Sequence, residues 1–131
     1  METLLRAALV DWLRADPALS TNLNAIVEEA PARATAPWLG LVASASADWS
    51  TKDRAGREVR VALELHFRGD EPATGSDLTV ALESRLRSLP RDLAGFDIVT
   101  ATFLRARVER RAANTRAALL EYRFLLLGDP A

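Results

Sequence analysis

The chain has 131 residues, no cysteine and a formal net charge of −1, and 49% of its residues are hydrophobic. A chain of this length fits one domain, so we expect a single domain over residues 1–131. The hydrophobic share argues against disorder, and the near-zero charge argues against a general attraction to nucleic acid. Without cysteine there are no disulfides, thiolate metal sites or cysteine nucleophiles.

The sequence also gives no sign of a membrane or export segment. No apolar run approaches the roughly 20 residues that a membrane-spanning helix needs. At the N-terminus, Glu2, Arg6, Asp11 and Arg14 interrupt the apolar residues, which is unlike a signal peptide. We therefore expect a protein that is made in the cytoplasm and kept there, or in something assembled there, with no membrane partner.

The first predicted element is an amphipathic helix. Its apolar residues recur at helical spacing and form one stripe: Leu4, Leu5, Ala8, Leu9, Trp12 and Leu13. The pair Asp16-Pro17 ends the helix, because a residue before proline avoids helical angles. Such a stripe needs a sheet to cover it.

Two strands of a hairpin are predicted next, after a brief strand at residues 25–27 and an alanine- and proline-rich loop to residue 37. The first long strand places Leu39, Leu41, Ala43, Ala45, Ala47 and Trp49 on one side, and Gly40, Ser44, Ser46 and Asp48 on the other. Residues 51–56, "TKDRAG", are expected at the hairpin tip. The second strand alternates apolar residues from Val59 to Phe67 with Glu58, Arg60, Glu64, His66 and Arg68.

A second helix and a second hairpin follow. Thr74 or Ser76 is expected to cap the helix, and Leu89-Pro90 to end it. The helix stripe consists of Leu78, Ala81, Leu82, Arg85, Leu86 and Leu89. The second hairpin has one strand from Phe96 to about Val108, a polar turn around Asn114, and a last strand that begins near Thr115.

This order predicts an α+β fold. We expect a mostly antiparallel four-stranded sheet made of two long hairpins, plus a short strand, with two helices packed on one face. The last strand is apolar on both sides: Ala118, Leu120, Tyr122, Phe124 and Leu126 on one, Ala117, Leu119, Leu125 and Leu127 on the other. Two short helices cover only one face of such a sheet. Part of the second face and at least one sheet edge are therefore expected to meet another chain.

Signatures of catalysis are missing from the sequence. The glycines form neither a phosphate-binding loop nor a nucleophile elbow. His66, the only histidine, has Glu64 two residues away on the same strand face, but a solvated histidine in a row of charges is the favoured interpretation. The carboxylate pairs Glu28-Glu29 and Asp70-Glu71 are expected in or beside loops. We predict no enzyme activity, no catalytic residue, no metal site and no cofactor.

Arginines gather at the second hairpin. All basic residues except Lys52 are arginine, and five lie at or near this hairpin: Arg105, Arg107, Arg110, Arg111 and Arg116. Contact with a subunit or partner is the favoured interpretation, because interfaces are rich in arginine. A solvated hairpin and contact with nucleic acid remain alternatives, although no aromatic residues interleave for base stacking.

Assembly is the physical inference from these patterns, while the copy number is not. Hairpin tips with mixed charge suit head-to-tail contacts, which close into a ring if the rotation per subunit is right. The candidate subunit or partner interface combines the tip of the first hairpin, the polar face of its second strand and the second hairpin. Its residues are Lys52, Asp53, Arg54, Arg60, Glu64, His66, Arg68, Arg105, Arg107, Arg110, Arg111 and Arg116.

Four segments carry a resemblance to a known family. They are "LRAALVDWLRADPALS", "AIVEEAPARATAPWLGL", "DWSTKDRAGREVRVALELHF" and "LAGFDIVTATFLRARVERRAANTRAALLEYRFLLL". Together they cover nearly the whole chain, and they resemble the tail-terminator, or tail-completion, family of long-tailed bacteriophages and phage-like gene transfer agents. The heavy use of arginine departs from a generic member and leaves the charge of any ring lumen open.

The resemblance implies a structural virion protein at the head–tail junction. Six copies would form a homo-oligomeric ring on the head-proximal end of the tail tube. That ring would stop polymerisation of the tail tube protein, dock the head-completion (stopper) protein, and let DNA pass through its lumen in a transient, non-specific way. The family has no catalytic residues to carry over. The alternative from another class is a small nucleic-acid-binding module that uses the arginine-rich hairpin 105–116.

Overall fold

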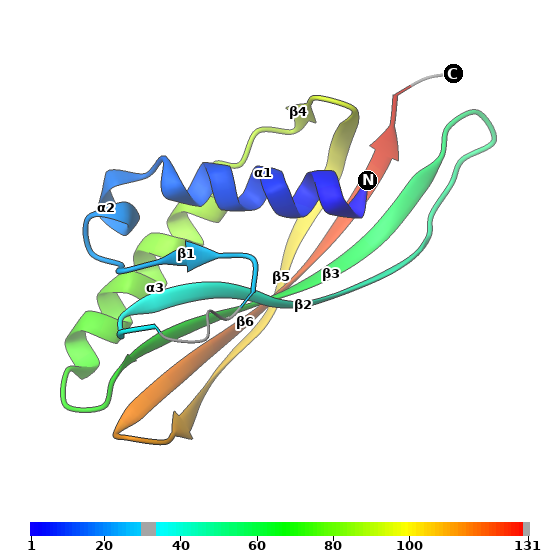
Figure 1. Ribbon diagram of the computed structural model, residues 1–131. Coiled ribbons are helices and arrows are strands. Elements are labelled where there is room, and N and C mark those ends of the chain that lie inside the picture. The colour runs from blue at the N-terminus through cyan, green and yellow to red at the C-terminus, as the bar shows by residue number, and fades with distance from the viewer. Residues whose placement is uncertain (30–33, 130–131) are drawn as a thin grey trace.

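The protein is a curved sheet with helices packed on one face, as the computed structural model shows over residues 1–29 and 34–129 (Figure 1). In chain order the elements are α1 (Glu2–Arg14), α2 (Pro17–Ser20), β1 (Ile26–Val27), β2 (Trp38–Asp48), β3 (Gly56–Arg68), α3 (Pro72–Arg87), β4 (Asp92–Leu93), β5 (Phe96–Arg111) and β6 (Thr115–Gly128). Part of the predicted loop after β1, residues 30–33, lies outside the described residues.

The sheet contains two long antiparallel hairpins, as the sequence predicts. The strand order is β1-β2-β3-β6-β5-β4, so β3 and β6 lie at the centre. Only the β1–β2 pair is parallel. The α+β class is confirmed, whereas the predicted element count is wrong, because the described chain has six strands and three helices.

The missed elements are the shortest ones. α2 is a single turn that the Asp16 side chain caps by accepting a hydrogen bond from the Ala18 N–H at 3.2 Å. β4 has two residues, which pair with Phe96 and Asp97 at the start of β5. Neither is long enough to show a hydrophobic period in the sequence.

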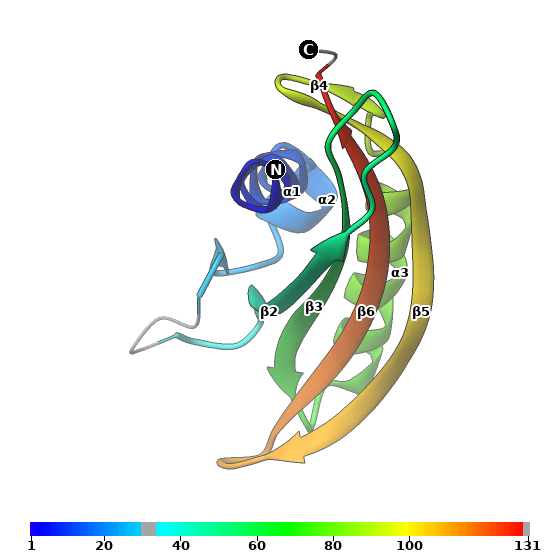
Figure 2. The same cartoon turned by 90° about the vertical axis from the view of Figure 1, so that its right-hand side faces the viewer.

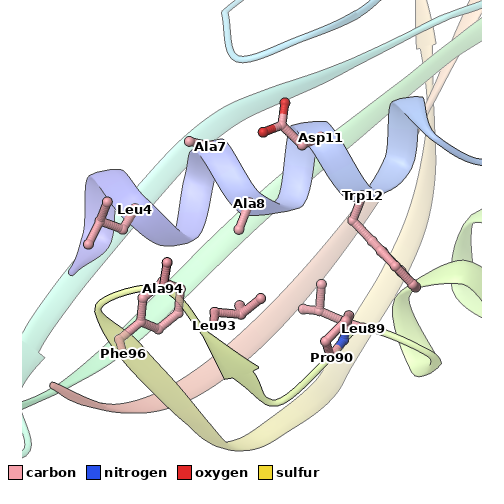
Figure 3. Close-up of a pocket in the computed structure, with 10 residues that line it drawn as sticks. All are labelled: Leu4, Ala7, Ala8, Asp11, Trp12, Leu89, Pro90, Leu93, Ala94 and Phe96. Carbon is pink, nitrogen blue, oxygen red and sulfur yellow. The ribbon is translucent and has the colours of Figure 1, made fainter. Parts of the chain in front are cut away.

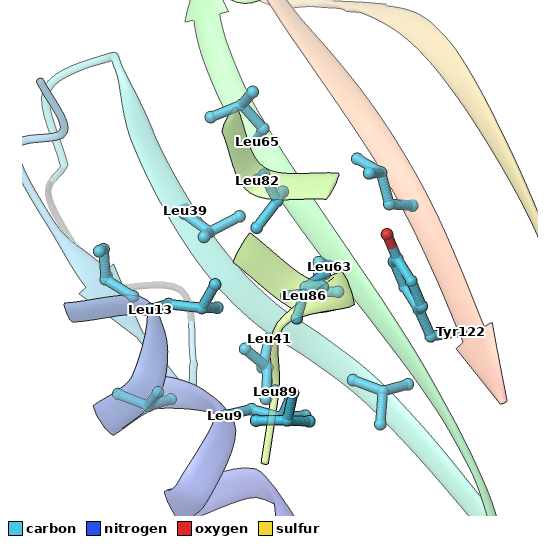
Figure 4. Close-up of a cluster of buried hydrophobic side chains, with 14 of the residues drawn as sticks. Leu9, Leu13, Leu39, Leu41, Leu63, Leu65, Leu82, Leu86, Leu89 and Tyr122 are labelled. Carbon is cyan, nitrogen blue, oxygen red and sulfur yellow. The ribbon is translucent and has the colours of Figure 1, made fainter. Parts of the chain in front are cut away.

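The core lies between the helices and the inner side of the sheet (Figure 4). Leucines of α1 and α3 meet the apolar positions of β2, β3 and β6, and burial of each large side chain contributes about 1.5–3 kcal/mol before entropy is subtracted. Arg85 and Trp12 join the two helices: Trp12 Nε1 donates to the Arg85 carbonyl at 2.8 Å, and Arg85 Nε donates to the Trp12 carbonyl at 2.9 Å. The guanidinium also lies 3.5 Å from the centre of the Trp12 ring.

The predicted assignment of β2 residues to the two sides of the sheet is wrong beyond Leu41. The β2–β3 register shifts between Leu41 and Ala43, so Val42 is an extra residue that forms a β-bulge. Leu39 and Leu41 are buried in the core, but Ala43, Ala45 and Ala47 lie on the opposite face and are exposed. Alanine and serine alternate there, and small residues on both sides give the sequence no means of locating the bulge.

The predicted start of the second helix is also wrong. α3 begins at Pro72, a favoured first position, and no side chain caps it. The earlier start brings Gly75 onto β3, where a Cβ at Gly75 would lie 2.5 Å from atoms of the Phe67 ring. Gly75 is thus required for the close approach of α3 to the sheet.

We predict that Gly75→Ala destabilises the protein by roughly 1–3 kcal/mol, because overpacking outweighs the better helix propensity of alanine. Thermal and denaturant unfolding measure the effect. The matched control is Ser76→Ala, on the exposed side of the same turn, which should leave stability nearly unchanged. A more stable Gly75→Ala variant would contradict this packing.

Candidate assembly surface

One face of the sheet carries no helix, and we call it the uncovered face. Figure 2 shows α1 and α2 on the left of the curved sheet, with no element of the described chain to its right. The register places side chains of all four long strands here, for example Ala45, Arg60, Arg123 and Thr102 in one row. Charged and polar residues on this face include Glu58, Arg60, Glu64, His66, Arg105, Arg107, Glu109, Arg111, Glu121 and Arg123.

Most charges on the uncovered face are paired within the chain. Arg105 donates to Glu121, its neighbour in the β5–β6 register, through Nε to Oε2 at 2.7 Å and Nη2 to Oε1 at 3.2 Å. These hydrogen bonds lower the pKa of Glu121. Arg60 pairs with Glu58 at 3.2 Å, and Arg107 with Glu109 at 3.1 Å. The uncovered face therefore carries a network of paired positive and negative charges, which we call the charge lattice, rather than a basic patch.

Arg111 links three strands of this lattice. It pairs with Glu109 on its own strand and, across β6, with Glu64 at 3.3 Å. Its hydrogen bond to Glu109 lowers the pKa of that carboxyl. Ala117 lies in register between His66 and Glu109, and it is 0% exposed although no helix covers it. The small alanine leaves room for Arg111 to reach β3.

His66 is held by an aromatic stack. Its ring lies parallel to that of Trp38, with centroids 4.1 Å apart, and its Nε2 is 3.1 Å from Glu64 Oε1. The Trp38 ring covers Gly40, where a Cβ would lie 2.9 Å from Trp38 Cζ3. Burial lowers the pKa of His66, although Glu64 opposes this shift. The arrangement favours a neutral, packed imidazole.

The hairpin tip differs from the prediction in one residue. Lys52 and Asp53 are exposed at the tip, but Arg54 bends back onto the end of the sheet. Its Nε donates to the Gly128 carbonyl at 2.8 Å, and its Nη2 to Asp97 Oδ2 at 2.9 Å. Arg54 therefore ties the first hairpin to β5 and β6.

The predicted arginine cluster divides between the two sides of the sheet. Arg105, Arg107 and Arg111 lie on the uncovered face, whereas Arg110 and Arg116 are register partners on the opposite side. Arg68 is exposed and pairs with Asp70 at 3.5 Å, so it does not join the lattice. Strand alternation separates residues that are close in sequence.

Two long strand edges are open among the described residues. β1 pairs with β2 only at Leu39 and Gly40, and β4 pairs with β5 only at Phe96 and Asp97. The rest of both outer edges carries backbone groups without a strand partner. The helix layer also stops short of β5, so Phe103 (46%) and Val108 (63%) are exposed on the helix side of this strand. Val99 (47%) and Leu104 (38%), at its two register shifts, are exposed as well. An open edge of this length is a template for pairing with a strand of another chain.

An apolar groove runs along α1 from Leu4 to Trp12, between this helix and the segment that holds β4 and the start of β5 (Figure 3). It has a volume of about 430 Å³, and Leu4, Ala8 and Trp12 face Leu93 and Phe96 across it. Asp11 points away from these apolar side chains. The groove offers contact area without paired acids and bases.

Residues 1–29 and 34–129 contain no group of three or more histidine and acidic side chains that could hold a metal ion. Of the helices in these ranges, none combines the length and apolar character needed to cross a bilayer.

Comparison with known proteins decides the family. The family model described as tail completion protein gp17 matches residues 7–127. The chain belongs to the tail completion protein family. Among solved structures, it is similar to a chain from the virion of a native gene transfer agent (GTA) particle, with a TM-score of 0.80, 25% sequence identity and 97% of each chain covered. Among curated proteins, none matches the chain significantly.

The resemblance inferred from the four sequence segments is thus confirmed. A tail completion protein is a structural component of the virion, so this chain is a particle protein that associates with other tail or head proteins. Sequence reasoning predicted that at least one sheet edge meets another chain, but it missed the Trp38 stack and which two edges of this tail completion protein are open. The edges could have been found only from the brevity of β1 and β4, which have no clear sequence pattern.

The neutral state of His66 generates a pH prediction. Because its folded pKa is lowered, the unfolded chain takes up the proton first as the pH falls, so the contribution of His66 to stability is lost on going from about pH 7.5 to about pH 5.5.

The test compares free energies of unfolding of the wild type and His66→Gln at both pH values. Wild type should lose more stability than the variant over this interval, and the two should run parallel above it. Equal pH dependence would contradict the packed neutral imidazole. Glu109 and Glu121 do not interfere, because their lowered pKa values lie below this window.

Proposed function

We propose that this chain forms a homo-oligomeric ring, with six copies, at the head-proximal end of the tail tube. The ring ends polymerisation of the tail tube protein and joins the tail to the head-completion (stopper) protein, and DNA passes through its lumen. The chain acts without catalysis or cofactor. Its place is the head–tail junction of a phage or gene transfer agent particle assembled in the bacterial cytoplasm.

The observation that carries the proposal is the open state of both sheet edges in a member of a tail completion family. A solitary domain with exposed edge strands and exposed Phe103 and Val108 is prone to aggregate. Head-to-tail contact between copies removes both edges at once, and such contacts close into a ring when the rotation between copies is right. The similarity to a chain from a gene transfer agent virion supports a place within a particle.

The interface residues fall into two roles in this proposal. Glu64, His66, Arg60 and the arginines of β5 lie on the uncovered face and fix its charge pattern; Lys52, Asp53, Arg68, Arg110 and Arg116 surround the hairpin ends and contact neighbouring chains. Charged rows of this kind set register and partner choice more than affinity. Arg54 acts indirectly, since it positions the tip of the first hairpin.

The alternative, a nucleic-acid-binding module on hairpin 105–116, is less well supported by the geometry. Arg105, Arg107 and Arg111 are each paired with a glutamate. Pairing removes most of the free charge that would displace counterions from phosphates. Retention of short duplex DNA by the purified chain, weakening steeply with salt, would favour this alternative.

The test of the proposed function is particle assembly in a producer strain that lacks this chain. We expect tail tubes without heads and with a broadened length distribution, because nothing ends the tube or docks the stopper. The wild-type chain supplied in trans should restore joined particles of uniform tail length, and so should Val80→Ala, which changes an exposed residue of α3. Normal, head-bearing particles in the absence of the chain would overturn the proposal.

A further inference from the structure

The two open edges of the sheet have regular stretches of similar length. β2 has its bulge at Val42, so its outer edge is regular from Ala43 to Asp48. β5 has register shifts before Thr100 and before Arg105, so its outer edge is regular from Arg105 to Arg111. All three irregularities lie in the two edge strands, and the stretches beyond them are free.

The strand directions make these two edges complementary. Each neighbouring pair from β2 to β5 is antiparallel, so β2 and β5, at opposite sides of four strands, run in opposite directions. A second copy in the same orientation, placed beside the first, therefore presents its β2 antiparallel to β5. The antiparallel alternation of strand directions therefore continues from one copy into the next without inverting a subunit.

We propose that the subunits join by strand pairing: residues 105–111 of β5 pair with residues 43–48 of β2 in the next copy, which closes the sheets into one antiparallel barrel. This inference rests on the proposed ring and names its interface. The occupant of each open edge is a second copy of this chain. The pairing also covers Val108, the most exposed large apolar residue of β5.

The stagger that this pairing requires agrees with barrel geometry. Within one sheet Ala45 is level with Thr102, so bringing residues 43–48 beside residues 105–111 shifts neighbouring copies by about five or six residues along the strands. That shift is roughly 17–20 Å over four strands that together span about 19 Å, which corresponds to a strand tilt of about 40–45°. Strands of closed barrels tilt by about 35–45°.

The bulk of the helices decides which face lines the channel. Six copies would give a barrel of about 24 strands with a backbone radius of roughly 25 Å, well beyond the 16–18 strands that already leave an aqueous channel. A helix layer about 10 Å inside this radius would have only about 16 Å of arc per copy, less than two helices of about 10–12 Å need. The helices therefore lie outside, and the uncovered face, with its paired charges, forms the inner wall.

The cysteine-free sequence makes the pairing directly testable by disulfide cross-linking. Ser44, Ser46, Ala106 and Val108 lie on the helix side of the two edges and take no part in the charge lattice. The double variants Ser46→Cys/Ala106→Cys and Ser44→Cys/Val108→Cys test one antiparallel register, and Ser46→Cys/Val108→Cys tests the register shifted by two residues. Each is assembled with the tail tube protein of its own particle, oxidised and run on a denaturing gel.

We expect at least one double variant to give a ladder of disulfide-linked multimers that ends at the copy number of the ring. The control Ser46→Cys/Ser84→Cys places its second thiol on the exposed side of α3 and should stay monomeric on the gel. Single variants should stay monomeric as well. A dimer from a single variant would mean two-fold pairing of like edges and would overturn the proposal.

Native mass spectrometry of the same samples separates the two proposals. Rings that form without cross-links in any double variant would overturn strand pairing and leave the proposed function intact. If no oligomer forms when the tail tube protein is present, both fail. Circular dichroism and thermal melting of each variant establish that it is folded, which the exposed positions of Ser46, Ala106 and Val108 favour.

Discussion

The structure depends on one constraint: the helices cover a single face of the sheet, and the outer two of its four long strands, β2 and β5, are left mostly unpaired on their outer edges. Leucines of α1 and α3 bury the inner side of β2, β3 and β6, and this core uses the apolar residues that the short helices can reach. β5 lies beyond that cover, so Phe103 and Val108 remain exposed. Such a chain has a buried core of its own, but it leaves apolar side chains and strand edges exposed. That combination suits a subunit of an assembly.

Much of this architecture could be predicted from the sequence, because period-2 and helical patterns are strong in the long elements. Both hairpins, α1 and the buried side of β3 were predicted correctly. The errors have physical causes: Val42 forms a bulge among small residues, Pro72 starts α3 without a side-chain cap, and α2, β4 and the short parallel pairing of β1 are too brief for any period. The charged residues of β3 and β5 were identified, but their mutual pairing could not be, because Glu64 and Arg111 meet only through a register that the sequence does not reveal.

The uncovered face shows how a chain rich in arginine can avoid acting as a general nucleic-acid binder. Arg105, Arg107 and Arg111 are held by glutamates on the same or neighbouring strands, and His66 is stacked in a neutral form on Trp38. Exposed pairs of this kind contribute little to stability. Their use is to fix the position of each charge and to keep the surface close to neutral, which fits the wall of a channel that DNA crosses without binding, as proposed for this tail completion protein.

The most direct measurement of edge pairing is amide hydrogen exchange in the free chain and in the assembled ring. In the free chain, amides on the outer edges of residues 43–48 and 105–111 should exchange quickly, while those of the central strands β3 and β6 are protected. On assembly both edge stretches should become protected together, with little change in the centre of the sheet. Edges that continue to exchange quickly in an intact ring would contradict the account, because the subunits would then be joined by another surface.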